Sequence, residues 1–438
     1  MKPDHTPEQV ELLHYMAKWL LLSVIAAALA GSASAFFLFA LERVTQIRVA
    51  SPQIIWLLPL AGFAVGWIYH RLGKDVEAGN NLIIDEIHDP KKTIPLRMAP
   101  LVLGGTVLSH LFGASVGREG TAVQMGATLA DQIAHMLRLD RDTRRVLVMA
   151  GMSAGFSSVF GTPVAGAIFG LEVLAIGRMR YDAILPCIVA AIVADRVGLW
   201  WGIHHTHYVL GAVPAVGTTG LVAVVVAGIA FGMAGMLFAT LTHTLSDTAK
   251  RHVPYGPARP LLGGAIVALA VWLSGTQRYI GLGIPVIVQA FQQPLGFEDS
   301  IGKLAFTVVS LGSGFKGGEV TPLFYIGATL GNALAPLLHL PFPLLAALGF
   351  VAVFAGAANV PLASTVMAIE LFGGEIAPYA ALACVVSYLF SGHTGIYRAQ
   401  RIGRAKHRRA LPEDLRLSEL HAYRARERAR PAAQRPEQ

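Results

Sequence analysis

The 438 residues are 54% hydrophobic and only 14% charged, with a mean hydropathy of +0.55. These values exclude an ordinary soluble domain and predict a polytopic membrane protein. The formal net charge of +8 gathers in short connections and in the C-terminal tail. The two cysteines, Cys187 and Cys384, each lie in an apolar segment, which excludes a disulfide framework as the basis of the fold.

Apolar stretches near the length of about 20 residues that spans a bilayer occur along the whole chain. The clearest are 19–41, 54–69, 221–241 and 262–273. The first is long, follows a polar or mixed segment and lacks an obvious cleavage site, so we interpret it as a retained helix and not as a signal peptide. Other runs are short or interrupted by glycine and proline, a pattern typical of closely packed and broken membrane helices.

One acid, Glu119, stands between glycines and between two largely apolar runs, 98–116 and 122–136. A carboxylate at membrane depth costs roughly 3 kcal/mol or more if it stays charged, so such a residue indicates a functional site. The alternative is a carboxylate that only complements its own helix N-terminus, which is worth roughly 0.3 to 1 kcal/mol. The apolar flanks, and a matching acid in the second half of the chain, favour function.

Two landmarks recur in the same order at an offset of about 200 residues. One is an acid two residues before a threonine, followed by Gly-Ala-Thr-Leu, and the other is a proline followed nine residues later by a glutamate. The copies are Glu119 with 126–129, Glu319 with 327–330, Pro163 with Glu172, and Pro361 with Glu370. Two landmarks at one offset favour structural repeats over chance similarity, and the repeated Glu172 and Glu370 are interpreted as structural.

Glycine-rich breaks stand at corresponding positions of the two halves, at 113–120 and 312–322. Each precedes a helix-forming run, so the free N–H groups and the positive dipole end of that helix point at the break. Secondary transporters with duplicated halves hold an ion near the middle of the membrane with such half-helix N-termini. The pattern therefore predicts a site for a small anion.

These residues resemble the CLC family of chloride channels and anion/proton antiporters over nearly the whole chain. The resemblance is carried by Gly-Arg-Glu-Gly at 117–120, Gly-Gly-Glu-Val-Thr-Pro at 317–322, the run from Pro163 to Glu172, and Tyr397. It implies an all-α polytopic membrane protein with the CLC-type fold, two inverted-topology repeats and broken half-helices. It also implies a homodimer with one anion pathway in each subunit.

Four departures from the common family pattern are similar to the fluoride/proton antiporter branch, CLC-F. Gly-Asn-Asn-Leu-Ile at 79–83 replaces the usual serine turn, and Glu-Val-Thr occupies 319–321. Thr121 stands in place of a proline, and Val173 stands in place of the inner proton-relay glutamate. The resemblance therefore implies a fluoride/proton antiporter that exports fluoride. The alternative is a chloride channel or chloride/proton exchanger of the same family.

The site residues divide into acids and anion-binding groups. Glu119 is expected to be the gating and proton-coupling acid, because when ionised it competes with the anion and when protonated it loses that attraction. Glu319 is a candidate proton relay or an acceptor of a hydrogen bond from protonated Glu119; the alternative is a helix-capping acid that faces solvent. The expected anion-binding residues are Asn80, Asn81, Gly117, Arg118, Gly120, Val320, Thr321 and Tyr397.

Within this set, fluoride requires strong convergent donors to replace its lost water, and amide, hydroxyl and backbone N–H groups supply them. The anion ligand is Asn80 or Asn81, with neither favoured. Val320 only shapes the space, and the main role of Arg118 is interpreted as support of the local fold.

Two further motifs are interpreted without a catalytic role. His-His-Thr-His at 204–207 has no supporting cysteine or carboxylate pattern, so no metal site and no cofactor are predicted. Residues 151–155 match the Gly-x-Ser-x-Gly elbow of hydrolases, but they approach an apolar helix, where close packing explains them. Because a zinc motif and a phosphate loop are also missing from the sequence, the chain is not expected to be an enzyme.

Basic residues in the tail predict a cytoplasmic C-terminus, in preference to nucleic-acid binding. The expected location is the bacterial inner membrane, with several passes, and the expected partners are fluoride or chloride, protons, membrane lipid and a second copy of the chain. The predicted division is an N-terminal cytoplasmic segment at 1–16, a first repeat at 17–203, a connection at 204–217, a second repeat at 218–397 and a basic tail at 398–438.

Overall fold

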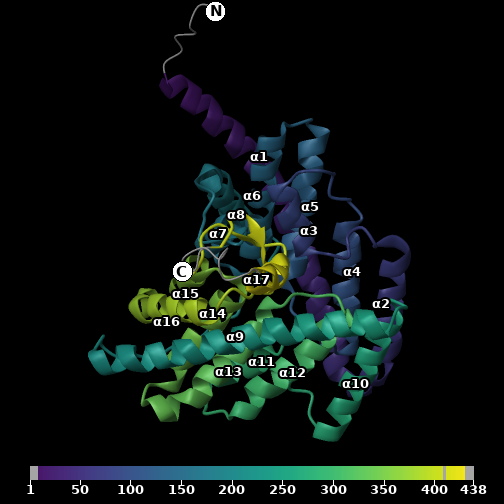
Figure 1. Cartoon of the computed structure of the whole chain (residues 1–438), viewed down its shortest axis with the longest axis vertical. Coiled ribbons are helices and arrows are strands. Elements are labelled where there is room, and N and C mark those ends of the chain that lie inside the picture. The colour runs from purple at the N-terminus through teal and green to yellow at the C-terminus, as the bar shows by residue number, and fades with distance from the viewer. Residues whose placement is uncertain (1–7, 408–410, 430–438) are drawn as a thin grey trace, which may run out of the picture.

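The computed structural model describes residues 8–407 and 411–429, and helices make up most of them (Figure 1). The helices of the first half are α1 (Glu8–Ala50), α2 (Leu58–Leu72), α3 (Asn80–His88), α4 (Met98–Phe112), α5 (Glu119–Met136), α6 (Arg141–Phe160), α7 (Pro163–Glu172) and α8 (Ile184–Trp200). Those of the second half are α9 (Thr218–His252), α10 (Ala258–Ser274), α11 (Ile284–Gln292), α12 (Phe297–Ser313), α13 (Val320–Leu338), α14 (Phe342–Ala358), α15 (Pro361–Phe372) and α16 (Ala377–Phe390).

The remaining elements are short. Four 3-10 turns are η1 (Pro52–Leu57), η2 (Tyr181–Ala183), η3 (Gly374–Ile376) and η4 (Leu417–Glu419), and the tail carries α17 (Leu420–Ala429). The strands β1 (Ala175–Ile176), β2 (Arg401–Ile402) and β3 (Leu415–Arg416) form one small sheet, in which β1 and β2 are parallel and β2 and β3 antiparallel. These counts apply to the described residues.

The helices α1 to α8 correspond one by one to α9 to α16. The short helices α3 and α11 have nine residues each and follow Gly79 and Gly283, which have φ angles of 58° and 77°. Helices α4 and α12 both end at a left-handed glycine, Gly113 with φ 91° and Gly314 with φ 108°. Glycine adopts positive φ without steric cost, so the same residue type breaks the chain at the same point of each half.

The repeated Gly-Ala-Thr-Leu marks a close helix contact in each half. A Cβ on Gly126 of α5 would lie 2.2 Å from the carbonyl oxygen of Gly151 in α6. A Cβ on Gly327 of α13 would lie 2.0 Å from the carbonyl oxygen of Gly349 in α14. Only glycine allows backbones to approach this closely, which is a common packing mode of membrane helices.

Helices α7 and α15 cap each other reciprocally. The Glu370 carboxylate at the end of α15 accepts two N–H groups from the start of α7, at 2.9 and 2.8 Å. The Glu172 carboxylate at the end of α7 accepts two from the start of α15, at 3.1 and 2.9 Å. The donors belong to Val164, Ala165, Leu362 and Ala363. Each carboxylate thus satisfies free N–H groups and complements a helix dipole, which accounts for the repeated proline–glutamate spacing.

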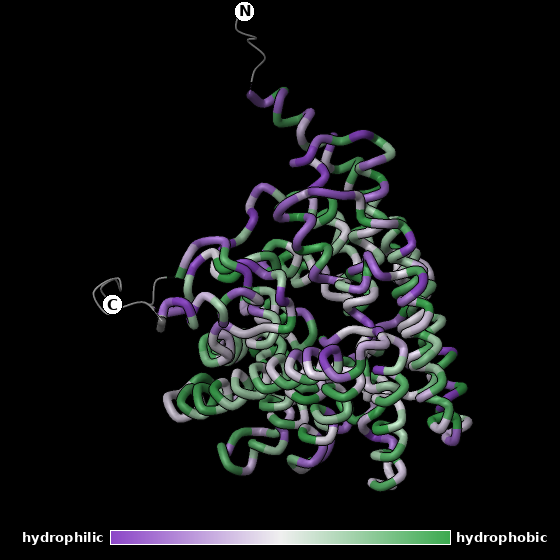
Figure 2. The backbone as a smooth tube through the Cα atoms, turned by 45° about the vertical axis from the view of Figure 1, so that its right-hand side comes forward, coloured by the Kyte–Doolittle hydropathy of each residue, from purple (hydrophilic) through white to green (hydrophobic). Residues whose placement is uncertain are grey.

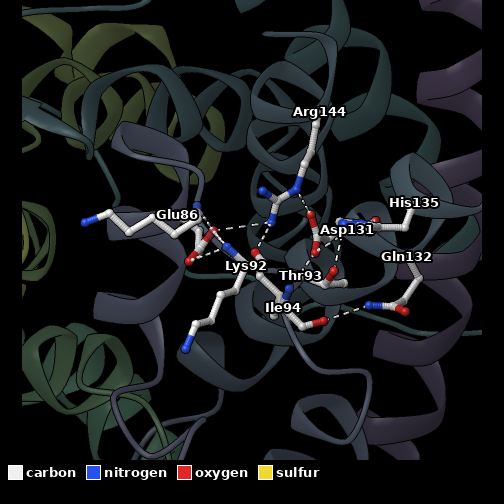
Figure 3. A network of polar contacts seen from close by, with 9 residues as sticks. Glu86, Lys92, Thr93, Ile94, Asp131, Gln132, His135 and Arg144 are labelled. Carbon is white, nitrogen blue, oxygen red and sulfur yellow. Dashed lines mark hydrogen bonds and ion pairs between the residues drawn. The ribbon is translucent and has the colours of Figure 1, made fainter. Parts of the chain in front are cut away.

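A buried polar network fixes the end of α5 opposite to Glu119 (Figure 3). Asp131 is fully buried and accepts from Arg144 Nε of α6 at 2.5 Å and from the Ile94 N–H at 2.7 Å. Arg144 also donates to the Lys92 carbonyl, and Gln132 donates to the Ile94 carbonyl, both at 2.7 Å. The connection between α3 and α4 is therefore held against α5 and α6.

Five segments among the described residues are long and apolar enough to cross a membrane: Glu8–Ala50, Pro52–Leu72, Tyr181–Trp200, Thr218–His252 and Val320–Leu338. Figure 2 shows hydrophobic residues along most helices, while hydrophilic residues gather in the connections at the N-terminal end of the molecule and in the C-terminal tail. Large apolar side chains are exposed on the helices that surround the core, including Phe36, Leu60, Leu237 and Trp272. Such a surface is that of a multi-pass membrane protein.

Candidate functional site

The two glycine-rich breaks lie against each other at the centre of the molecule. The Gly117 N–H donates to the Gly318 carbonyl at 2.6 Å, and the Gly318 N–H donates to the Gly117 carbonyl at 2.8 Å, as in an antiparallel pair. A Cβ on Gly318 would lie 2.8 Å from the Gly120 nitrogen. This contact brings the N-termini of α5 and α13 together, as the sequence predicts for a site between two repeats.

Both oxygens of the Glu119 carboxylate accept hydrogen bonds from these helix N-termini. Oε2 accepts from the N–H groups of Arg118 and Thr321, each at 3.1 Å, and Oε1 accepts from the Thr321 hydroxyl. The carboxylate is fully buried, and Arg118 Nε lies 3.9 Å from Oε1. Glu119 on α5 therefore occupies the positive N-terminal end of α13, which is a ready-made position for an anion.

Asn80 and Glu319 approach Gly120 from the other side. A Cβ on Gly120 would lie 3.2 Å from Asn80 Nδ2 and 3.9 Å from Glu319 Oε2, so glycine leaves room for both side chains. Asn80 is buried, and its Oδ1 has no hydrogen-bond partner among the described residues. Val320, the first residue of α13, is buried and shapes this region with its side chain.

The structure separates the two asparagines that the sequence leaves equivalent. Asn81 Oδ1 accepts the Ala399 N–H at 2.9 Å, so its side chain ties α3 to the segment that carries Tyr397. Asn80 instead directs its amide nitrogen at Gly120. The Tyr397 ring is buried, and its hydroxyl makes no hydrogen bond to another described residue.

The C-terminal segment holds Tyr397 in place. Gln400 is fully buried and donates to the carbonyls of Val173 and Ala358, at 2.8 and 3.1 Å. Its Oε1 accepts from Asn359 Nδ2 at 2.9 Å. Strand β2 follows directly and pairs with β1, so the segment after Tyr397 is fixed against the end of α7 and the end of α14.

Two cavities lie on either side of this centre. The Tyr397 cavity, of about 240 Å³, is lined by Asn80, Asn81, Glu319 and Tyr397 among others. The Arg118 cavity, of about 30 Å³, is lined by Arg118, Thr321, His205 and Tyr208 among others. Because Glu119 bonds to Arg118 and Thr321, while its neighbour Gly120 contacts Asn80 and Glu319, the carboxylate lies between the two cavities.

Sequence reasoning missed several residues of this region. Thr121 is buried and shares a 2.7 Å hydrogen bond with the Thr106 hydroxyl, which joins α5 to α4; its departure from the family proline was the only signal. His205, considered for a metal, lines the Arg118 cavity beside Tyr208. Lys316 lines the Tyr397 cavity, and no motif marked it.

The hydrolase-like motif lies inside α6 and not at a strand-to-helix turn. Ser153 is fully buried, and a Cβ on Gly170 of α7 would lie 2.1 Å from its Oγ. Ser153 therefore packs against α7, while the flanking Gly151 and Gly155 allow α6 to approach α5, where a Cβ on each would lie 2.4 and 2.3 Å from the carbonyl oxygens of Gly126 and Ala122.

Two repeats whose half-helix N-termini converge on a buried carboxylate between two cavities define an ion-transporting membrane protein. Residues 61–392 match the voltage gated chloride channel family. A chloride/fluoride channel protein of Pseudomonas syringae pv. tomato is 66% identical over 431 residues, which are 97% of this chain and 95% of that protein. A putative chloride channel protein, ClcB-like, of Ralstonia nicotianae is 30% identical over 310 residues, with 65% of this chain and 69% of that protein covered.

Solved structures of two antiporters have the same fold as this chain. The crystal structure of a CLC-type fluoride/proton antiporter is 37% identical and superposes with a TM-score of 0.85, covering 88% of this chain and 98% of that one. A slow cyanobacterial Cl⁻/H⁺ antiporter, 20% identical with a TM-score of 0.74, shares the fold over 85% of this chain and 94% of its own. The chain therefore belongs to the voltage gated chloride channel family. This membership confirms the predicted all-α fold with two inverted-topology repeats and broken half-helices.

Proposed function

We propose that this protein exchanges fluoride for protons and exports fluoride from the cell. The support is the 66% identity to a chloride/fluoride channel protein and the 37% identity, over 98% of its length, to a CLC-type fluoride/proton antiporter. The observation that carries the mechanism is the buried Glu119 carboxylate, held by Thr321 and the Arg118 N–H between two cavities. Glu119 is the gating acid in this proposal.

Exchange follows from competition for the same donors. The ionised carboxylate uses the N–H groups of Arg118 and Thr321 and the Thr321 hydroxyl, and a fluoride ion in the same place needs those donors too. Protonation removes the charge of Glu119 and frees the donors, so the side chain leaves and the anion enters. A proton therefore moves on Glu119 only when fluoride moves the other way.

The Tyr397 cavity supplies the next positions of both ions. Asn80 Nδ2 and the Tyr397 hydroxyl are donors without another described partner, and they hold the anion before it takes the place of Glu119 at the donors of Arg118 and Thr321. Glu319 lines the same cavity close to Gly120 and takes the proton. Val173 stands where the family usually has its relay glutamate. It is fully buried, its carbonyl accepts a hydrogen bond from Gln400, and its side chain cannot carry a proton. In this proposal Glu319 is the proton relay instead. The space available at the site is set by Gly117, Gly120 and Val320.

The further expectations of assembly and location belong to this proposal. The protein is a homodimer in the bacterial inner membrane, with its C-terminus and the Tyr397 cavity on the cytoplasmic side. Basic tail residues support that orientation, because Arg398 lines the Tyr397 cavity. The division into 1–16, 17–203, 204–217, 218–397 and 398–438 stays a prediction, as does the absence of catalysis.

The decisive experiment is reconstituted fluoride efflux with simultaneous recording of pH. Purified protein in liposomes loaded with fluoride drives proton uptake as fluoride leaves, and an equal chloride gradient drives much less. Proton movement driven equally or better by chloride would replace this proposal with a chloride/proton exchanger, the function class named for the cyanobacterial antiporter of the same fold. Chloride flux without any pH change would indicate a channel.

A further inference from the structure

A second, wider cavity continues the Tyr397 cavity. It measures about 470 Å³, and the two together are called the vestibule here. They share a wall built by α2, α9, the end of α12 and the turn before α13. The shared residues are Tyr69, Glu77, Ser246, Lys250, Leu311, Phe315 and Lys316. The vestibule therefore reaches from Glu319 outward as one space, in contrast to the Arg118 cavity of about 30 Å³.

Lys316 is held in the wall of this vestibule by apolar and aromatic contacts. A Cβ on Gly105 of α4 would lie 3.1 Å from both Cβ and Cγ of Lys316, so the lysine stem packs on that glycine. Its Nζ lies 4.1 Å from the centroid of the Tyr69 ring. The acid that attracts it electrostatically is Glu77, which lines the same wall. The ring fixes the position of the ammonium group but does not neutralise it.

The vestibule carries a surplus of positive charge. Lys74 and Lys250 line it together with Lys316, and among the described residues none of the three is in an ion pair. The acids that line it are Glu77 and Glu319. Arg398 lines it too, but its charge is balanced by Asp247 at 2.6 Å. A cleft with one sign of charge and low-dielectric walls concentrates ions of the opposite charge.

We infer that Lys316, positioned on Tyr69, is a separate anion-holding site where a hydrated monovalent anion waits before it reaches Glu319 and Asn80. The volume supports a hydrated ion: six waters need about 180 Å³ at about 30 Å³ each, which the Tyr397 cavity of about 240 Å³ accommodates. The inference rests on the proposed function in one respect, namely that the anion is fluoride.

The chemistry of lysine sets what this site does. An ammonium group is a compact, strongly hydrated point charge, so it attracts an anion without stripping its water. The Lys316 site therefore raises the local anion concentration but does not distinguish fluoride from chloride. Selection takes place deeper, where Asn80, Thr321 and the backbone N–H groups replace the water shell.

The test compares transport kinetics of Lys316→Met, which keeps the length of the side chain and removes its charge. At low ionic strength we expect the KM for fluoride to rise about three- to tenfold, the range for one charge at about 6 Å in partly screened surroundings. At high ionic strength the difference from wild type disappears, because salt screens the site. The maximal rate and the ratio of protons to fluoride do not change.

Two variants keep the result interpretable. Lys316→Arg retains the charge and restores the wild-type KM, while Lys91→Met removes an exposed lysine outside the vestibule and has no effect. If Lys316→Met and Lys316→Arg both lower the maximal rate, or if the KM effect survives high salt, the role of Lys316 is packing and the inference is wrong. If the protein moves chloride and not fluoride, the proposed function fails, and the same salt-dependent KM shift measured with chloride still decides the Lys316 site.

Discussion

The reciprocal caps of α7 and α15 give a prediction whose size follows from the structure. Glu172 accepts two backbone N–H groups, and hydrogen bonds to a charged group are worth about 1.5–3 kcal/mol each. Gln in its place keeps one acceptor oxygen and loses the charge that complements the α15 dipole. We expect Glu172→Gln to lower the free energy of unfolding by about 2–4 kcal/mol. Glu370 is only half-buried, so Glu370→Gln costs about half as much.

The assay is denaturant unfolding in detergent micelles, with Glu375→Gln as the control, an exposed acid on η3 directly after α15. The two caps lie at opposite ends of α7, about 15 Å apart for a helix of this length. Their effects therefore add to within about 0.5 kcal/mol in the double variant. Stability of Glu172→Gln equal to that of the control would refute the structural role of these acids.

Three further changes test the site and its support. Gly120→Ala places a methyl group against a backbone atom and should lower fluoride transport at least about tenfold by the loss of site geometry, whereas Gly104→Ala, with open space around it, leaves the rate unchanged. Asp131→Ala removes the carboxylate nearest to the buried Arg144, which keeps Glu86 at 3.5 Å, and leaves the Ile94 N–H without its acceptor, so it should cost about 2–4 kcal/mol of unfolding free energy; a loss below 1 kcal/mol would contradict this. Asp140 caps α6, and its hydrogen bonds to Thr143 lower its pKa. Its stabilisation is present above the unfolded value of about 3.9 and is lost as the pH falls. Asp140→Ala should therefore cost about 1 kcal/mol at pH 7 and progressively less as the pH falls below the unfolded value and then through the lowered folded value, and a cost that does not change with pH would count against the cap.

Much of the fold follows from local sequence signals. The repeated Glu-x-Thr with Gly-Ala-Thr-Leu predicts duplicated helices, and the structure uses Gly126 and Gly327 at equivalent crossings. Glu119 is marked by its own chemistry, because an acid between apolar runs needs compensating donors. Those donors, at Arg118 and Thr321, could be expected from the helix start that follows each glycine-rich break.

The remaining features depend on contacts between distant residues, which no local pattern encodes. Gly117 pairs with Gly318 only because the two repeats face each other. Asn80 and Asn81 are adjacent and chemically identical, and only the position of Ala399, far along the chain, assigns one to the segment after Tyr397. No sequence motif marks Lys316, because the role of its charge depends on vestibule residues that lie far from it along the chain.

Fluoride-driven proton movement in the Glu119→Gln variant tests the central claim most directly. In liposomes loaded with fluoride, the wild-type protein should acidify the lumen as fluoride leaves. The variant keeps the shape of the side chain but cannot ionise, so it should pass fluoride while proton movement stays at the level of empty liposomes. Glu375→Gln, measured in parallel, should behave as wild type. Proton movement that still follows fluoride in Glu119→Gln would show that another group carries the proton, and that the carboxylate between the two cavities is not the gate.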